Sequence, residues 1–274
     1  MAEILKAILF GIVQGVTEWI PISSTGHMIL LEEFLPLHVS QAFRDAFFVV
    51  IQFSSILAVV LLYFDRLFPF GREKSKRQKR DAWAIWCKIA VAAVPAGLIG
   101  ILFDDMIDHY LYKSQVVALA LVVYGVLFLV MEGKQRKPEV TKMEELSFRK
   151  AFLIGVFQVL ALVPGTSRSG ATILGAVYLG CSRTIASEFS FILAIPVMVG
   201  ASMLKLLKTG FVYSPMEWTM LAVGCLSSFL VSMSAIKSLL AYVRKRDFKV
   251  FGYYRIVIGF IIILYFWASG HTLT

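Results

Sequence analysis

The chain has 274 residues and a net charge of +9, and its composition is 58% hydrophobic and only 16% charged. A soluble domain of this length would be far less apolar, so the composition excludes an ordinary soluble enzyme and predicts a polytopic inner-membrane protein. The basic residues cluster in short loops beside apolar stretches, where they act as topology signals, so the positive charge does not indicate a nucleic-acid partner.

The first apolar segment, 4–35, is interrupted near its middle by the sequence WIPISSTGH at 19–27. Backbone that leaves the helix at membrane depth must be covered by protein or by a water-filled cavity, because lipid cannot satisfy its N–H and C=O groups. We therefore expect a helix, a turn and a second helix that returns to the same face, covered by other parts of the chain. The segment has no basic region at its start and no small-residue cleavage site, so we expect it to remain in the mature protein.

Six uninterrupted stretches are long enough to cross about 30 Å of hydrocarbon at about 1.5 Å per residue. Three precede a second broken segment, and three follow it: 43–64, 83–103 and 115–132, then 185–207, 217–240 and 251–269. The loops 65–82, 133–150 and 241–250 carry most of the lysine and arginine, which predicts that they lie in the cytoplasm. Both chain ends would then lie outside the cytoplasm.

The second broken segment, 148–180, matches the first. At an offset of 144 without gaps, residues 6–30 and 150–174 share nine identities in 25 positions, including Gly11 with Gly155 and Ser23 with Ser167. Because three predicted spans separate the copies, they would enter the membrane from opposite faces, as in an inverted-topology repeat. The expected fold is an all-α polytopic membrane protein with six transmembrane helices and two re-entrant hairpins. It forms a single domain, 1–274, with repeat 1 at about 1–132 (hairpin 4–35) and repeat 2 at about 145–274 (hairpin 148–180).

Each of these two polar interruptions, or breaks, leads directly into a predicted helix. SSTG precedes HMILLEEFL, and PGTSRSGAT at 164–172 precedes ILGAVYL. The free N–H groups and the dipole of a helix N-terminus favour an anion, so two such ends facing each other predict an anion pocket. Arg168 lies in the second break, where a buried guanidinium costs at least about 2.5–3.5 kcal/mol and persists mainly when it is paired or functional. A phosphate group can accept two parallel hydrogen bonds from the planar guanidinium of Arg168.

The first break supplies the other groups with chemical potential. Gln14 and Glu18 lie four residues apart, on one helical face, and Glu18 could act as a base, as a metal ligand or as the structural counter-ion of Arg168. His27 follows Ser24 by one helical turn, a spacing that suits a base and its nucleophile, although a lone histidine at a helix start is often only a cap or an interface residue.

At these residues the sequence resembles the undecaprenyl pyrophosphate phosphatase family, the bacitracin-resistance type of integral-membrane phosphatase. The motif Gln14-Gly-Val-Thr-Glu18 matches the family pattern Glu/Gln-x-x-x-Glu and continues into SSTGH. Residues 164–172 match the longer pattern Pro-Gly-x-Ser-Arg-Ser-x-x-Thr. The resemblance covers nearly the whole chain.

The resemblance implies hydrolysis of undecaprenyl diphosphate to undecaprenyl phosphate and phosphate, which recycles the lipid carrier of cell-wall synthesis. It implies a multi-pass enzyme of the bacterial cytoplasmic membrane, with an isoprenyl diphosphate lipid as its substrate and a site open toward the outer face. It also implies a divalent cation, Mg²⁺ or Ca²⁺, with Glu18 as its candidate ligand. Because position 14 is glutamine, only one carboxylate remains in that motif, which argues against a two-carboxylate metal site.

The site residues that the resemblance implies fall into two groups. The catalytic group is Glu18, Ser24, His27 and Arg168. The group expected to bind the substrate phosphates is Gln14, Ser23, Thr25, Gly26, Gly165, Ser167, Ser169 and Thr172.

A lipid flippase or secondary transporter is the competing interpretation, because inverted repeats with broken helices are typical of transporters. The two breaks are unequally equipped: the second has Leu162 and Ala171 where the first has Glu18 and His27. Two breaks with different functional side chains favour a catalytic site over the paired gates of a transporter. A scaffold protein would leave the buried arginine and carboxylate unexplained. The sequence is compatible with a monomer and with a homodimer.

Overall fold

A computed structural model of the chain describes residues 1–111, 113–133, 137–209 and 213–269. Its regular structure is helical, with an isolated bridge between Val140 and Cys181. The α-helices are α1 (Ala2–Thr17), α2 (Ser24–Phe34), α3 (Gln41–Leu62), α4 (Phe64–Leu67), α5 (Lys76–Leu111), α6 (Ser114–Gly133), α7 (Phe148–Val159), α8 (Arg168–Tyr178), α9 (Arg183–Thr209), α10 (Pro215–Val243) and α11 (Lys249–Ser269). The 3₁₀ turns are η1 (Met143–Glu145) and η2 (Leu160–Leu162).

Within the described residues, six helices are long and apolar enough to cross a membrane: α3, α5, α6, α9, α10 and α11. They correspond one to one to the predicted spans, so this part of the prediction is confirmed. The helix that differs most is α5, which begins at Lys76 and not at 83 and continues past a kink at Phe103 to Leu111. Hydropathy marks only the apolar part of that helix, whereas lysine, arginine and glutamine are good helix formers that extend it into the basic loop.

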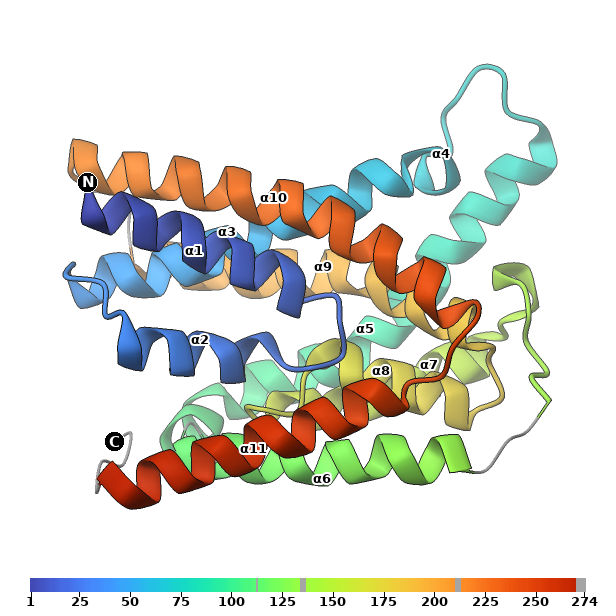
Figure 1. The fold of residues 1–274 in the computed structure, drawn as a ribbon. Coiled ribbons are helices and arrows are strands. Elements are labelled where there is room, and N and C mark those ends of the chain that lie inside the picture. Colours follow the sequence, from blue (N-terminus) through green and yellow to red (C-terminus); the bar gives the residue numbers. More distant parts are fainter. Residues whose placement is uncertain (112, 134–136, 210–212, 270–274) are drawn as a thin grey trace.

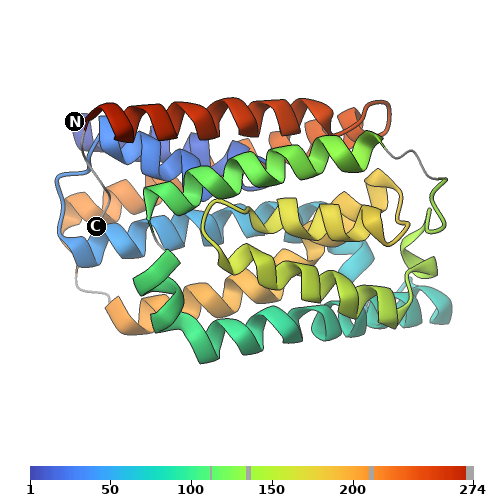
Figure 2. The ribbon, with the colours of Figure 1, turned by 90° about the horizontal axis from the view of Figure 1, so that it is seen from below.

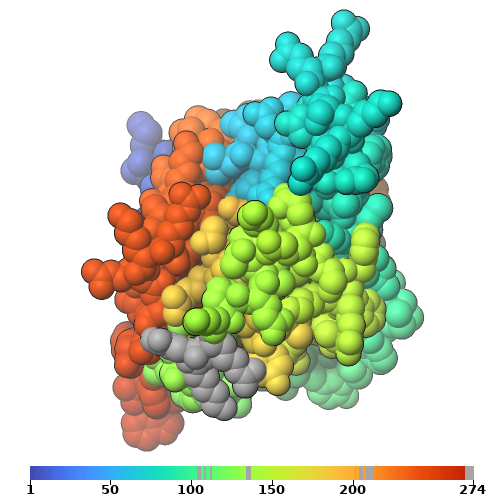
Figure 3. All heavy atoms as spheres, turned by 90° about the vertical axis from the view of Figure 1, so that its right-hand side faces the viewer, coloured from blue at the N-terminus to red at the C-terminus, as the bar shows by residue number. Residues whose placement is uncertain are grey.

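The long helices run alongside one another (Figure 1). Met1 and the last turn of α11 lie at one end. The connections α4–α5, α6–α7 and α10–α11, which carry the clusters of basic residues, lie at the other end, which Figure 3 views directly. Two members of the second basic loop, Lys134 and Arg136, fall outside the described residues.

The helices of two pairs, α1–α2 and α7–α8, are shorter than the six long helices. The turn between α1 and α2 and the turn between α7 and α8 both lie near the mid-length of the long helices, and the two pairs approach from opposite ends (Figures 1 and 2). Helix α1 packs against α10 and α7 packs against α5, while α6 and α11 pack against each other. The two turns are covered by the chain itself, because Trp19 and Ser23 in the first and Thr166 in the second are buried.

Gly11 and Gly155 allow these helix pairs to touch backbone to backbone. A Cβ atom on Gly11 would lie 2.3 Å from the carbonyl oxygen of Gly224 in α10. A Cβ atom on Gly155 would lie 2.1 Å from the carbonyl oxygen of Ala92 in α5. Small residues at such contacts are a common means of packing helices inside membranes. The two contacts occupy matching positions at the offset of 144.

We expect Gly155→Val to destabilise the protein, because the added side chain would overlap the backbone of α5. Overpacking of this kind typically costs about 1–3 kcal/mol, which corresponds to a fall in Tm of at least about 3 °C. Gly97→Val is the matched control, since a Cβ atom there has no neighbour within 4 Å. Thermal unfolding of both purified variants checks this expectation, and an equal Tm for the two would contradict it.

Candidate active site

Both breaks end in a serine with an unusual backbone conformation. Ser23 has a φ of 75° and Ser167 a φ of 71°, and each precedes the first residue of a helix. The Ser23 hydroxyl accepts the N–H of Gly26 at 3.4 Å, and the Ser167 hydroxyl accepts the N–H of Gly170 at 3.1 Å. A positive φ in a residue with a side chain is uncommon and costs about 1–3 kcal/mol, and such strain clusters at functional sites. The two helices therefore begin in the same manner.

The carboxylate of Glu18 is the point at which the two breaks meet. It is buried, and its Oε2 accepts hydrogen bonds from the hydroxyl of Ser24 at 2.9 Å and the amide of Gln14 at 3.1 Å. Its Oε1 lies 3.5 Å from Nη2 of Arg168. The Ser169 hydroxyl donates to the main-chain carbonyl of Glu18 at 3.1 Å. Since Ser24 and Arg168 are the first residues of α2 and α8, two helix N-termini converge on one carboxylate.

The guanidinium of Arg168 is held mainly by α9. Its Nη1 donates to the carbonyl oxygen of Ser190 at 2.7 Å, and the group lies over the ring of Trp19 at 5.6 Å. Thr172 shares a 2.6 Å hydrogen bond with the Ser190 hydroxyl. The Nε of Arg168 has no hydrogen-bond partner among the described residues. Because its contact with Glu18 is long and involves a single nitrogen, part of the guanidinium fork remains available to an anionic ligand.

His27 faces α11 and makes no hydrogen bond to Ser24. Its Nδ1 lies 2.7 Å from the carbonyl oxygen of Ser23, and its Nε2 lies 2.7 Å from the hydroxyl of Tyr254, whose ring is stacked on the imidazole. Since a carbonyl can only accept, Nδ1 carries the proton, and Nε2 of the neutral ring accepts from Tyr254. The Ser24–His27 pair suggested by the one-turn spacing is not formed, because Ser24 donates to Glu18.

The three remaining residues predicted to bind phosphate have different surroundings. Thr25 is half-buried in the first turn of α2. Gly26 and Gly165 pack against α6: a Cβ atom would lie 3.2 Å from Leu121 at the first position and 2.4 Å from the carbonyl of Val117 at the second. Gly165 also has a φ of +90°. Close packing and backbone conformation therefore require a glycine at position 165, whereas at position 26 the Leu121 side chain would need to move only slightly. Contact of either glycine with phosphate stays a prediction.

Arg255 joins the two breaks and received no role in the sequence analysis. It is fully buried in α11. It donates to the carbonyl oxygen of Pro21 in the first break at 3.2 Å, and to those of Gly165 and Thr166 in the second at 2.9 and 2.8 Å. Its guanidinium lies over the ring of Tyr124 at 5.5 Å. A charged residue within a predicted apolar span is the signal that could have revealed it.

Comparison with known proteins adds an independent observation. Residues 7–261 match the family described as Bacitracin resistance protein BacA. The chain belongs to this family. It is 55% identical to an undecaprenyl-diphosphatase of Acetivibrio thermocellus, over 98% of this chain and 99% of that one. It is 52% identical to undecaprenyl-diphosphatase 1 of Clostridioides difficile, over 97% of both chains, and 52% identical to an undecaprenyl-diphosphatase of Enterococcus faecalis, over 96% of both. The resemblance inferred from the two motifs is confirmed.

The side chains of this BacA-family protein provide few ligands for a metal. Within the described residues, no group of three His, Cys, Asp or Glu side chains could hold an ion. Glu18 supplies carboxylate oxygens, and Gln14 places an amide beside it. Mg²⁺ is usually held by one or two carboxylates together with water and substrate phosphates. These donors therefore fit a divalent cation shared with a phosphorylated substrate, and they do not form a closed protein site.

For this BacA-family chain we expect Arg255→Lys to lower kcat about tenfold or more while the protein stays folded. Lysine keeps the charge but cannot reach the carbonyls of both breaks at once, so the two helix starts would lose their common support. Turnover per folded protein and KM for an isoprenyl diphosphate check this expectation. A kcat close to that of the parent protein would show that Arg255 does not position the breaks.

Proposed function

We propose that this chain hydrolyses undecaprenyl diphosphate to undecaprenyl phosphate and inorganic phosphate, and so returns the lipid carrier to cell-wall synthesis. The observation that carries the proposal is the convergence of Ser24 and Arg168, each at a helix N-terminus, on the buried carboxylate of Glu18. The hydroxyl of Ser24, the carboxylate of Glu18 as a base and the guanidinium of Arg168 as a phosphate-binding group thus lie together. The names of relatives that are about half identical over their full length support the same substrate.

Arg168 and the N-termini of α2 and α8 bind the diphosphate. In phosphoryl transfer, the protein contributes mainly by positioning the substrate and by stabilising charge on the transferred phosphoryl oxygens. A guanidinium held by Ser190 and Trp19 is already oriented for that task, so little reorganisation accompanies the reaction. On substrate binding, a phosphate oxygen takes the part of the Arg168 fork that Glu18 does not occupy.

Glu18 acts as the base. The hydroxyl oxygen of Ser24 attacks the terminal phosphorus and its proton passes to Glu18, which is 2.9 Å away. The bond from that phosphorus to the bridging oxygen breaks, and undecaprenyl phosphate leaves. Water then hydrolyses the phosphoserine and releases phosphate. In the alternative version, a water oriented by Ser24 attacks directly and gives its proton to the same carboxylate.

A divalent cation, Mg²⁺ or Ca²⁺, would be held by Glu18 and by oxygens of the diphosphate. When bound, it neutralises negative charge on the phosphate oxygens. The protein's own groups retain their tasks: Arg168 binds the diphosphate, and Ser24 and Glu18 manage the nucleophile and its proton. Residues Gln14, Ser23, Ser167, Ser169 and Thr172 orient these groups through the contacts described above.

In the membrane, the pairs α1–α2 and α7–α8 form two re-entrant hairpins of an inverted repeat. The matching serine caps and the matching contacts of Gly11 and Gly155 support this arrangement. The basic loops lie in the cytoplasm, following the positive-inside rule, and both chain ends lie outside it. The active site then opens toward the outer face of the cytoplasmic membrane, where the α1–α2 hairpin enters.

Ser24→Ala separates the two versions of the mechanism. If Ser24 is the nucleophile, we expect kcat to fall by at least about a hundredfold, because no other atom replaces its oxygen. Trapping of phosphate on the protein during turnover gives a second readout, since the label should be absent from the variant. Near-normal kcat in Ser24→Ala would eliminate the serine nucleophile and leave the water mechanism.

The proposed activity itself is tested with purified protein in detergent. Undecaprenyl diphosphate or the shorter farnesyl diphosphate is added, and phosphate release is followed with and without a chelator of divalent cations. We expect one phosphate per lipid and an isoprenyl monophosphate as the second product. If folded protein releases no phosphate from either lipid, with or without added Mg²⁺ or Ca²⁺, the proposal fails and transport becomes the favoured function.

A further inference from the structure

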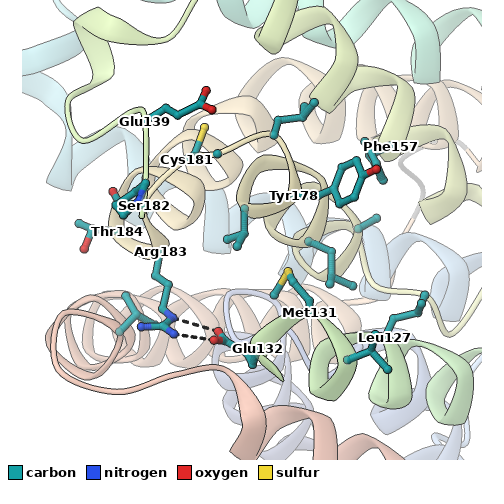
Figure 4. A pocket seen from close by; sticks show the side chains of 18 of the residues that line it. Leu127, Met131, Glu132, Glu139, Phe157, Tyr178, Cys181, Ser182, Arg183 and Thr184 are labelled. Atoms are coloured by element: carbon teal, nitrogen blue, oxygen red, sulfur yellow. Dashed lines mark hydrogen bonds and ion pairs between the residues drawn. The ribbon is translucent and has the colours of Figure 1, made fainter. Parts of the chain in front are cut away.

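A cavity of about 1060 Å³ lies apart from the catalytic cluster, between α6, α8 and the segment 137–139 (Figure 4). Neither Glu18 nor Arg168 lines it, and the proposed reaction makes no use of it. It lies toward the end of the molecule where the basic loops gather, because its lining includes the last turn of α6, the first turn of α9 and the residue after α10.

The lining of this cavity is divided into an apolar wall and a polar rim. Figure 4 shows Leu127, Phe157 and Tyr178 on one side, and Arg183 and Thr184 on the other. Leu127 is 45% exposed and Tyr178 is 69% exposed, although both are apolar or aromatic. The wall is therefore an exposed apolar surface that no described part of the chain covers, and it adjoins the polar rim.

The rim carries an excess of positive charge. Its two carboxylates are already neutralised: Glu132 pairs with Arg183 at 2.5 Å, and Glu139 pairs with Lys150 at 2.7 Å. Two further cations, Lys137 and Arg244, line the cavity and form no ion pair within the part of the chain that the structure describes.

We propose that this cavity binds an anionic phospholipid, with the headgroup phosphate between Lys137 and Arg244 and an acyl chain along the apolar wall. A phospholipid can use both parts of the lining, because its phosphate suits the basic rim and its acyl chain suits Leu127 and Tyr178, whereas free phosphate would use only the rim. The proposal uses the orientation given above, in which this end faces the cytoplasm. Basic pockets between transmembrane helices on that side suit the headgroups of anionic lipids.

The test is native mass spectrometry of the full-length protein in detergent, titrated with phosphatidylglycerol or phosphatidylcholine. We expect selective binding of phosphatidylglycerol, weakened about tenfold or more in the double variant Lys137→Gln/Arg244→Gln, because each basic group near a membrane surface contributes a factor of about five. The double variant Lys245→Gln/Arg246→Gln is the matched control. It removes two exposed charges from the α10–α11 connection, which also holds Arg244, and neither residue lines the cavity. Val177→Trp fills the cavity without changing the charge and should also weaken binding.

Several outcomes would overturn the proposal. Equal losses in the two double variants would indicate diffuse attraction to the basic surface, and equal binding of the two lipids would remove the role of charge. Displacement of phosphatidylglycerol by farnesyl phosphate would assign the cavity to an isoprenyl product instead. Phosphate release, measured in parallel, keeps this test separate from the proposed activity, because Lys137 and Arg244 lie outside the catalytic cluster.

Discussion

Replacing Arg168 by lysine is expected to lower kcat for isoprenyl diphosphate hydrolysis by at least about a hundredfold, the effect of losing a preorganised charge contact to the transition state. The guanidinium spans Ser190 on one side and Glu18 on the other, and it still has unused donors for phosphate. A lysine supplies one point charge and cannot make these contacts together. The measurement is kcat and KM of the folded variant, with Tm recorded alongside.

The ion pair of Arg183 with Glu132 offers a matched control nearer the end of the bundle that carries the basic loops. It too joins a guanidinium to a buried carboxylate, at 2.9 and 2.5 Å, but it connects α9 to α6 away from the active site. Arg183→Lys should therefore lower Tm and leave turnover per folded protein unchanged. Comparable loss of kcat in both lysine variants would mean that Arg168 serves stability and not phosphate binding.

The transmembrane helices could be predicted because the bilayer requires long apolar segments, and the breaks stood out because polar residues interrupt them. The convergence on Glu18 followed only from assuming that the two breaks face each other. Helical spacing suggested a Ser24–His27 pair, but spacing takes no account of neighbours from distant segments. In the structure the two imidazole nitrogens of His27 are hydrogen-bonded to the carbonyl of Ser23 and the hydroxyl of Tyr254 instead.

Residues that reach the site from other helices were harder to predict. Arg255 was visible as a charge within a predicted span, yet its bonds to carbonyls of both breaks depend on how α11 packs. Ser190 had no comparable signal, because a serine in a membrane helix usually bonds to its own backbone. Composition and motif thus point to the groups that we propose to react, whereas the groups that orient them emerge only from the packed helices.

Glu18→Gln is expected to reduce kcat by about a hundredfold to a thousandfold, because an amide can keep a hydrogen bond to Ser24 but cannot take its proton. The variant also leaves Arg168 without its counter-ion, so Tm must be measured together with turnover. Glu132→Gln removes a carboxylate of similar burial that pairs with Arg183, and it should lower Tm without lowering kcat per folded protein. Equal turnover of Glu18→Gln and the parent protein would rule out Glu18 as the base.

The double variant Ser24→Ala/Glu18→Gln shows whether the two residues act as a unit. If Ser24 and Glu18 act in the same chemical step, removing either residue abolishes the contribution of both. The double variant should then be no slower than the more damaged single variant. If the losses instead multiply, Glu18 must act on something other than the proton of Ser24. Because Glu18 also contacts Arg168 at 3.5 Å, multiplied losses would point to the carboxylate as the group that holds the guanidinium, or a shared cation, in place for the phosphate.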